Sequence, residues 1–263
     1  MKEWAIILGA SSGFGEATSI ELSKIGFNII GVHFDRRENL PQVEEVIKKI
    51  KENRVEALFF NMNAADPKNR EYILNEVEKK FKEDNEENSI FVVLHSIAFG
   101  TLRKFIDENK EETMTQKQLE MTLDTMANQL VYWVQDIFYR GLFKNGGRIF
   151  AMVSSGDDRV FPYYGAVSGA KAAIEAYIRQ LAYELAPFGI TANAIKAGVT
   201  DTPALRKIPQ NEELIKLALL KNPSKRLTTP QDVGKAIAAL CNKNLYWMTG
   251  NVIRVDGGED IAA

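Results

Sequence analysis

The sequence predicts an α/β protein in which a doubly wound parallel sheet of about seven strands carries helices on both faces. Apolar runs of strand length alternate with segments whose apolar residues recur at helical spacing. The strand-like runs are apolar along their whole length, as in strands that are covered on both faces. Because parallel neighbours need a long crossover, this alternation favours βαβ units with right-handed connections.

The predicted elements follow one another along the whole chain. Strand-like runs lie at 4–9, 27–34, 55–63, 90–98, 148–155, 190–198 and 250–258. Helical patterns lie at 14–26, 40–53, 71–83, 116–143 and 170–189. The stretch 199–222 contains prolines and short helical pieces after a strand end, so we expect a mobile lid there. No linker divides the chain, which predicts one domain over 1–263.

Composition excludes several classes of function. The formal net charge is −2, whereas a general nucleic-acid binder needs a basic surface. One cysteine and two histidines cannot build a disulfide framework or a Cys/His metal cluster, so we expect no metal. The sequence has no signal-peptide pattern and no run of about 18 apolar residues. We therefore expect a cytoplasmic protein that binds neither nucleic acid nor membrane.

A glycine-rich loop follows the first predicted strand and opens the first helix, in LGASSGFG. Glycines there permit a tight turn and close approach of the backbone to a pyrophosphate, which the helix N-terminus attracts. The strand–loop–helix context favours a dinucleotide site of the Rossmann type over a merely structural turn. The residues predicted to bind the cofactor here are Gly9, Ser11, Ser12, Gly13, Phe14 and Gly15.

The end of the second strand bears on the choice of cofactor. An acid there favours the ribose hydroxyls of NAD, and basic residues favour the 2′-phosphate of NADP. Asp35 indicates NADH, whereas Arg36 and Arg37 indicate NADPH. Because Asp35 comes later than a ribose-binding acid usually does, we predict NADPH, with NADH as the alternative. Asn63, at the end of the third strand, either holds the adenine or caps the strand.

With these motifs the sequence resembles the short-chain dehydrogenase/reductase superfamily over nearly its whole length. The resemblance rests on GASSGFG, Ser154, Lys171, AGVTDT (197–202) and MTGNVIRVDGG (248–258). Two features are similar to enoyl-acyl-carrier-protein reductases, in the branch with an ordinary glycine loop. These are HSIAFG (95–100) and the Tyr-x6-Lys spacing from Tyr164 to Lys171; DTPALRKIP (201–209) also resembles the substrate loop of that branch.

The resemblance implies further contacts with the cofactor and the substrate. Ser96, Ile97 and Ala98 are expected to line the nicotinamide ribose, and Gly198 and Val199 to meet the nicotinamide amide. Thr202 is expected to approach the pyrophosphate, and Lys171 to hold the ribose hydroxyls. The implied substrate is a thioester of acyl-carrier protein or coenzyme A in fatty acid synthesis, and the implied assembly is a homotetramer.

The spacing of YYGAVSGAK has a geometric meaning, because Val167 stands where the superfamily usually has its tyrosine. On a helix, Tyr164 lies about 20° from Lys171 and about 10 Å along the axis, whereas Tyr163 lies about 80° off. A displaced hydroxyl suits an enoyl thioester, whose charge develops on the thioester oxygen while hydride enters at C3. We predict that Tyr164 hydrogen-bonds the enolate oxygen, with Tyr163 as packing or substrate wall.

Some residues depart from the enoyl reductase pattern and leave alternatives open. Ser154 stands where many of these enzymes have a second tyrosine, and it either bonds the substrate carbonyl or caps the strand. Asp124 and Asn128 are the candidates for the superfamily's usual helix asparagine. His95 is either a proton relay or a buried strand-end residue. The alternative functions are a 2,4-dienoyl-CoA reductase, a carbonyl reductase that uses Ser154, and a nucleotide sensor without turnover.

Overall fold

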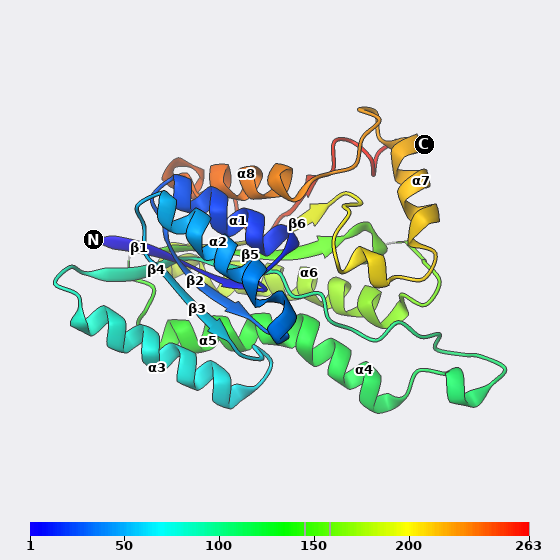
Figure 1. Cartoon of the computed structure of the whole chain (residues 1–263), viewed down its shortest axis with the longest axis horizontal. Helices are drawn as coiled ribbons and strands as arrows, with labels where there is room; N and C mark the ends of the chain where they lie inside the picture. The colour runs from blue at the N-terminus through cyan, green and yellow to red at the C-terminus, as the bar shows by residue number, and fades with distance from the viewer. Residues whose placement is uncertain (145, 158, 263) are drawn as a thin grey trace.

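The computed structural model describes residues 1–144, 146–157 and 159–262 of the chain. Its strands form one sheet in the order β3-β2-β1-β4-β5-β6-β7, and every neighbouring pair is parallel. Figure 1 shows the sheet in the middle, with α1, α2 and α8 over one face and α3, α5 and α6 over the other. The predicted Rossmann-type α/β fold is confirmed.

The strands of the sheet are spread along the whole chain, from residue 2 to residue 255. They are β1 (Lys2–Leu8), β2 (Asn28–His33), β3 (Ala57–Asn61), β4 (Asn88–His95), β5 (Gly147–Ser154), β6 (Ile190–Ala197) and β7 (Val252–Val255). The helices are α1 (Gly13–Lys24), α2 (Leu40–Glu52), α3 (Pro67–Glu83), α4 (Gln116–Leu123), α5 (Gln129–Tyr139), α6 (Gly165–Leu185), α7 (Asn211–Lys221) and α8 (Pro230–Leu240). None of these helices, nor any other in the described residues, is long and apolar enough to cross a membrane.

Two hydrophobic cores lie on the two faces of the sheet, because successive side chains of a strand point to opposite faces. On β1, Ile6 belongs to the core beneath α3, α5 and α6, and Ile7 belongs to the core beneath α1, α2 and α8. Both isoleucines are fully buried. The continuous apolar runs of the sequence therefore correspond to strands that are covered on both sides.

The helix α8 was missing from the sequence-based expectations. Its start carries a capping box, in which Thr229 and Asp232 bond each other's backbone N–H groups, and a proline follows the cap. Val233 and Ile237, one turn apart, are buried against the sheet. Gly234 permits close packing, because a Cβ there would lie 2.9 Å from the backbone of Ala17 on α1.

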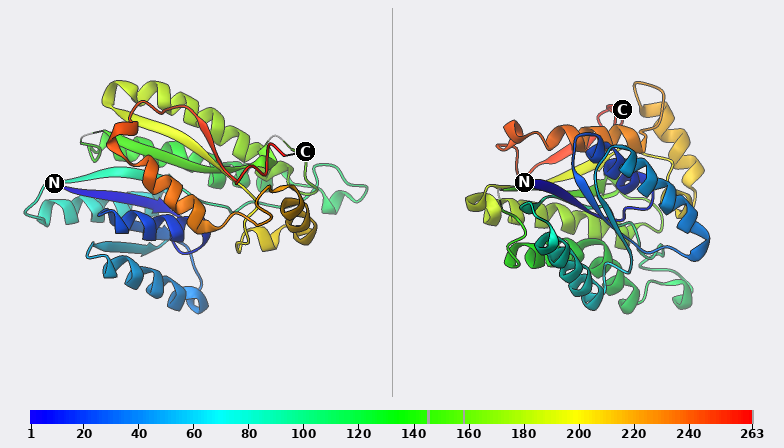
Figure 2. Two further views of the ribbon diagram at one scale, coloured as in Figure 1. Left: turned by 90° about the horizontal axis from the view of Figure 1, so that it is seen from above. Right: turned by 60° about the vertical axis from the view of Figure 1, so that its left-hand side comes forward.

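The single helix expected over 116–143 is divided into α4 and α5 by a π-helical turn, Asp124–Asn128. An extra residue in such a turn changes the direction in which the following side chains point, and π-turns are frequent near functional sites. The helix ends at Tyr139, and a short turn leads back to the sheet. Figure 2 places the segment before α4 and the helix α7 at the same end of the molecule, opposite the N-terminus.

Candidate active site

The predicted site residues follow the carboxyl ends of the parallel strands. In a doubly wound sheet a ligand binds at this edge, where the strand order reverses. The reversal lies between β1 and β4. There the Ser96 N–H donates to the Leu8 carbonyl over 2.9 Å, which joins the loop after β4 to the end of β1. The glycine loop and the HSIAFG segment are therefore neighbours in space.

The glycine loop is packed so closely that side chains are excluded from it. Gly9 has a φ of +93°, and a Cβ there would lie 2.5 Å from the Ser96 carbonyl oxygen. A Cβ at Gly15 would clash with the Gly9 carbonyl oxygen. α1 begins at Gly13, and the N–H groups of a helix's first turn have no intrahelical acceptor. This cradle fits the pyrophosphate of a dinucleotide.

Thr202 lies against this cradle, although it is far away in the sequence. Its methyl group would be 3.4 Å from a Cβ at Gly13. Its hydroxyl accepts a hydrogen bond from the Leu205 N–H over 3.2 Å, which fixes the turn that starts the lid segment. The predicted proximity of Thr202 to the pyrophosphate site agrees with this placement.

The end of β2 presents two exposed arginines and one restrained acid. In the described part of the chain, neither Arg36 nor Arg37 forms an ion pair, whereas the Asp35 carboxylate lies 3.0 Å from His33 Nδ1. Asn63 uses its side-chain oxygen to accept from the Ala65 N–H over 3.0 Å. Asn63 therefore caps its own turn, and its role toward adenine stays a prediction.

The two tyrosines before α6 point to different neighbours. The Tyr164 hydroxyl lies 3.4 Å from Ser154 Oγ at the end of β5. The Tyr163 ring lies under Lys104, whose Nζ is 5.8 Å from the ring centroid, on the segment between β4 and α4. Tyr163 has a φ of +64°, a conformation that costs a non-glycine residue about 1–3 kcal/mol. This strained residue turns the two adjacent rings apart and directs Tyr164 to Ser154.

Helix α6 begins at Gly165, with Tyr164 as its N-cap residue, so the helix starts later than directly after Pro162. Glycines on both sides make room for the aromatic rings. A Cβ at Gly156 would lie 2.5 Å from Tyr164 Cε1, and a Cβ at Gly165 would lie 2.7 Å from Phe105 Cε2. The position of Tyr164 therefore depends on the absence of a side chain at 156.

Lys171 is buried beneath the tyrosine, two helical turns further along α6. Its exposed fraction is 5%. Its ammonium group donates to the Met152 carbonyl of β5 over 2.7 Å. A buried cation needs such hydrogen bonds, and it favours negative charge that develops close by. Tyr164 thus contacts Ser154 at the end of β5, and Lys171 contacts Met152 on the same strand; the catalytic roles of the three residues stay a prediction.

Comparison with known proteins assigns the family. A family model described as "Enoyl-(Acyl carrier protein) reductase" matches residues 9–259. The chain belongs to this family of short-chain dehydrogenase/reductase proteins. Short chain dehydrogenase mdpC of Emericella nidulans is 25% identical over 97% of this chain and 94% of its own length. Enoyl-[acyl-carrier-protein] reductase [NADH] FabI of Aquifex aeolicus is 31% identical over 70% of this chain and 66% of its own.

A crystal structure agrees with the fold. That of enoyl-[acyl-carrier-protein] reductase (NADH) from Aquifex aeolicus superposes with a TM-score of 0.83 at 22% identity, over 100% of this chain and 97% of that one. The family is one of oxidoreductases, and nicotinamide cofactor binding is supported by the family and by the glycine cradle. One relative is named as a short chain dehydrogenase and the other as an enoyl-[acyl-carrier-protein] reductase, so the family alone does not fix the substrate.

His95 is fully buried at the end of β4 in this short-chain reductase. Neither ring nitrogen has a hydrogen-bond partner among the described residues. Burial, and after it the charge of Lys171, lower the pKa of His95 to about 3. The ring is therefore neutral at ordinary pH. This favours the interpretation of His95 as a buried strand-end residue over a proton relay.

Glu259 is a site residue that the sequence analysis missed. Both oxygens of its carboxylate lie 3.2 Å from the Val199 N–H, and only 7% of the residue is exposed. Burial raises the pKa of Glu259. Gly198 has no room for a side chain, because a Cβ there would clash with the Thr228 hydroxyl. Glu259 thus fixes the loop that is expected to meet the nicotinamide. Its carboxylate already accepts the hydrogen bond that the Val199 N–H would offer to the nicotinamide amide.

Neither candidate for the usual helix asparagine contacts the tyrosine and serine pair. Asn128 accepts a hydrogen bond from the Tyr177 hydroxyl over 3.0 Å, and it donates to Asp124 over 3.3 Å. The π-helical turn that contains both residues is thereby tied to α6. These contacts make the pair a support for α6, on which Lys171 lies.

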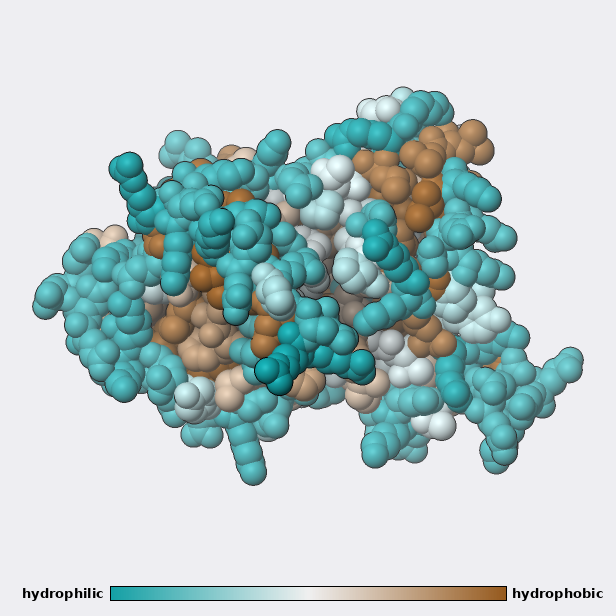
Figure 3. All heavy atoms as spheres, in the orientation of Figure 1, coloured by the Kyte–Doolittle hydropathy of each residue, from teal (hydrophilic) through white to brown (hydrophobic). Residues whose placement is uncertain are grey.

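Apolar side chains are exposed on both sides of the site. Phe99, Phe105 and Ile106, on the segment before α4, are 62%, 50% and 85% exposed. On α7, Leu217 and Leu220 are 46% and 71% exposed. Figure 3 shows apolar surface over α7 at the upper right. Helix α7 lies in the expected lid, 199–222, whose mobility stays a prediction. The exposed apolar residues before α4 would give the lid an apolar surface to pack against.

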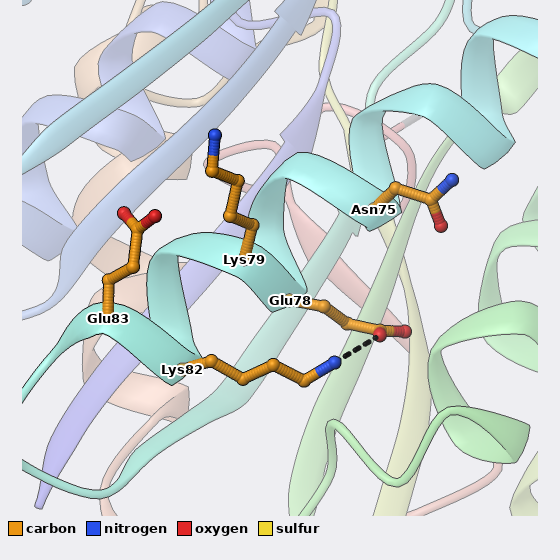
Figure 4. Close-up of a pocket in the computed structure, with 5 residues that line it drawn as sticks. All are labelled: Asn75, Glu78, Lys79, Lys82 and Glu83. Carbon is orange, nitrogen blue, oxygen red and sulfur yellow. Dashed lines mark ion pairs between the residues drawn. The ribbon is translucent and has the colours of Figure 1, made fainter.

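One surface depression lies away from these residues. It measures about 500 Å³ and lies along α3, lined by Asn75, Glu78, Lys79, Lys82 and Glu83. Figure 4 shows these side chains on successive turns of the helix, with Lys82 and Glu78 paired over 3.5 Å. Its lining carries acidic and basic side chains side by side, and it includes none of the predicted site residues. We read it as a solvated helix face.

We expect His95 to make the folded protein sensitive to acid. Its folded-state pKa of about 3 lies below the ordinary histidine pKa of 6.5, so the unfolded chain binds the proton more tightly. Stability is therefore lost as pH falls below 6.5, at up to about 1.4 kcal/mol per pH unit. Denaturant unfolding of wild type and His95→Gln at pH 8, 6 and 4.5 checks this. Parallel pH dependences in the two proteins would contradict it.

Gly156→Ala should displace the Tyr164 ring, because the new methyl group would lie 2.5 Å from it. We expect reductase turnover to fall at least about tenfold, since misplacing one catalytic group has a large effect on rate. Gly169→Ala on α6 is the matched control, because a Cβ there meets nothing within 4 Å. Steady-state kinetics of both variants tests the placement. Equal activity in the two would show that Gly156 does not position the ring.

Proposed function

We propose that this protein is an NADPH-dependent enoyl-thioester reductase, an enoyl-[acyl-carrier-protein] reductase of fatty acid synthesis. The observation that carries the proposal is the Tyr164 hydroxyl beside Ser154 Oγ, at 3.4 Å, in a chain with Val167 at the usual tyrosine position. Val167 is 5% exposed and packs in the core. The tyrosine hydroxyl therefore lies two helical turns before Lys171, at Tyr164, and not one turn before it, at position 167.

The chain's own groups act on the thioester carbonyl. When bound in the glycine cradle, a nicotinamide cofactor would supply the hydride that C3 of a trans-2-enoyl thioester accepts. Electrons of the C2–C3 double bond then move to the thioester oxygen, and Tyr164 is placed to donate a hydrogen bond to that oxygen. Buried Lys171 stabilises the negative charge and holds Met152, which fixes the end of β5. C2 takes a proton, which restores the carbonyl and completes the reduction.

NADPH is preferred in this proposal because of charge at the end of β2. Arg36 and Arg37 are exposed, and they offer two guanidinium groups to a 2′-phosphate. The acid that would disfavour a phosphate, Asp35, is engaged by His33 over 3.0 Å. NADH stays the alternative, since the Aquifex relative is named as an NADH enzyme.

The substrate's carrier and the assembly belong to the same proposal. Exposed apolar residues at 99, 105 and 106 and on α7 suit an acyl chain between the two segments. The thioester is then one of acyl-carrier protein or of coenzyme A. One domain over 1–263, a lid around 199–222, a homotetramer and a cytoplasmic location are part of what we propose.

Carbonyl reduction is the second candidate, favoured by the same Ser154–Tyr164 pair. A serine and a tyrosine hydroxyl at 3.4 Å can both bond a ketone oxygen. The similarity to mdpC over nearly the full length also fits a reductase of another substrate. The two candidates differ in which carbon receives hydride, so a substrate panel separates them.

We expect NADPH oxidation with crotonyl-CoA or crotonyl-acyl-carrier protein, and little with simple ketones. Tyr164→Phe should lower kcat by about 100-fold or more, because an oxyanion donor is removed. Tyr163→Phe is the matched control, and we expect it to retain activity within about threefold. Oxidation with ketones alone would reject enoyl reduction. Equal losses in the two variants would reject the assignment of Tyr164.

A further inference from the structure

The cofactor end of the site combines one acid with a buried histidine and two arginines. The Asp35 carboxylate lies 3.0 Å from His33 Nδ1, and the His33 side chain is 4% exposed. An ionised carboxylate only accepts hydrogen bonds, so Nδ1 carries the hydrogen that joins them. The Asp35 side chain is 19% exposed. The acid is therefore turned back toward the strand end and is not free in solvent.

Asn61 on the neighbouring strand holds the backbone of the same residue. Its side-chain oxygen accepts from the Asp35 N–H over 2.9 Å, and its side-chain nitrogen donates to the Asp35 carbonyl over 3.0 Å. His33 and Asn61 are partners in the β2–β3 register. One further hydrogen bond, from the Met62 N–H to the His33 carbonyl over 2.7 Å, closes this strand end. Asn61 thus fixes the backbone of Asp35, and His33 fixes its carboxylate.

This restraint matters for the choice between the two nicotinamide dinucleotides. A free carboxylate after β2 accepts hydrogen bonds from the ribose hydroxyls of NADH and repels the 2′-phosphate of NADPH. Arg36 and Arg37 follow Asp35 directly, so an unrestrained acid would also be available to pair with them. In the structure the arginines form no such pair within the described residues.

We propose that His33 and Asn61 are specificity-determining positioning residues. They hold Asp35 away from the ribose, so that Arg36 and Arg37 accept a 2′-phosphate and NADPH is selected over NADH. The inference rests on the proposed function only for its cofactor, since it is independent of the acyl substrate. Its alternative is that the same contacts merely finish the strand end, in which case they affect both dinucleotides equally.

A binding experiment without acyl substrate separates these cases. NADPH and NADH are titrated into the full chain, and their fluorescence gives a Kd for each, in wild type, His33→Phe, Asp35→Asn and the double variant. Phenylalanine keeps the ring that packs beside Phe59, at 6.2 Å between centroids, and removes the N–H. We expect His33→Phe to weaken NADPH about fivefold and to leave NADH within about twofold. In the Asp35→Asn background, His33→Phe should leave the ratio of the NADPH and NADH Kd values unchanged.

Asn61→Ala is the second probe, because the Asn61 side chain is exposed and its loss is compatible with folding. It should shift the ratio of the two Kd values toward NADH, again only while Asp35 is present. Circular dichroism and thermal unfolding check that each variant is folded. Equal weakening of both dinucleotides, or an undiminished shift in the Asp35→Asn background, would overturn the inference.

Reduction of enoyl thioesters is measured in a separate assay, so that failure of the proposed function and failure of the cofactor inference can be told apart. If enoyl thioesters are not reduced but His33→Phe still shifts the ratio of Kd values through Asp35, the proposed function fails and the cofactor inference stands. If enoyl thioesters are reduced but the ratio does not move, the cofactor inference fails and the proposed function stands.

Discussion

The hydrogen bond from Lys171 to the Met152 carbonyl is the contact on which the geometry of the site depends. It joins α6 to β5 inside the protein, where a charged group without partners would be costly. With α6 fixed in this way, the N-cap position of the helix brings Tyr164 over the end of β5. The strained backbone of Tyr163 and the missing side chain of Gly156 then direct the hydroxyl to Ser154.

The nucleotide side is fixed by close backbone packing in the same region. Gly9 meets Ser96 where β1 and β4 end, and Thr202 meets Gly13 from the far side of the sheet's carboxyl edge. Glu259 holds the Val199 loop from the end of the chain. These contacts bring together loops from distant parts of the sequence, and apolar side chains on the segment before α4 and on α7 are exposed. This arrangement is compatible with a bound nicotinamide dinucleotide, and the exposed apolar side chains beside it are the basis on which we propose an acyl substrate.

Much of the fold could be predicted from the sequence because its signals are local. A strand that is buried on both faces has a continuous apolar run, and the glycine loop needs its glycines for contacts within one strand–loop–helix unit. The helix α8 was missed although Thr229, Pro230 and Asp232 carry a capping signal. The break between α4 and α5 could not be predicted, since a π-turn is stabilised by contacts such as Tyr177 to Asn128 across two helices.

The candidate site was predictable where spacing on one helix decides it, as with Tyr164 and Lys171. It was not predictable where long-range contacts decide it. Nothing local indicates that Glu259 reaches Val199, or that Asn61 on the next strand holds the backbone of Asp35. Side chains of this kind, which act by holding another residue, leave a weak pattern in a single sequence.

The position of the transferred hydride tests the central claim most directly. The enzyme is incubated with NADPH carrying deuterium at the transferable position and with crotonyl-CoA or, in a parallel sample, a simple ketone, and the products are examined by NMR spectroscopy. Our account predicts a saturated thioester with deuterium at C3, because we propose that Tyr164 hydrogen-bonds the thioester oxygen while C3 receives the hydride. Deuterium found only on the carbinol carbon of a reduced ketone, with crotonyl-CoA unchanged, would contradict it.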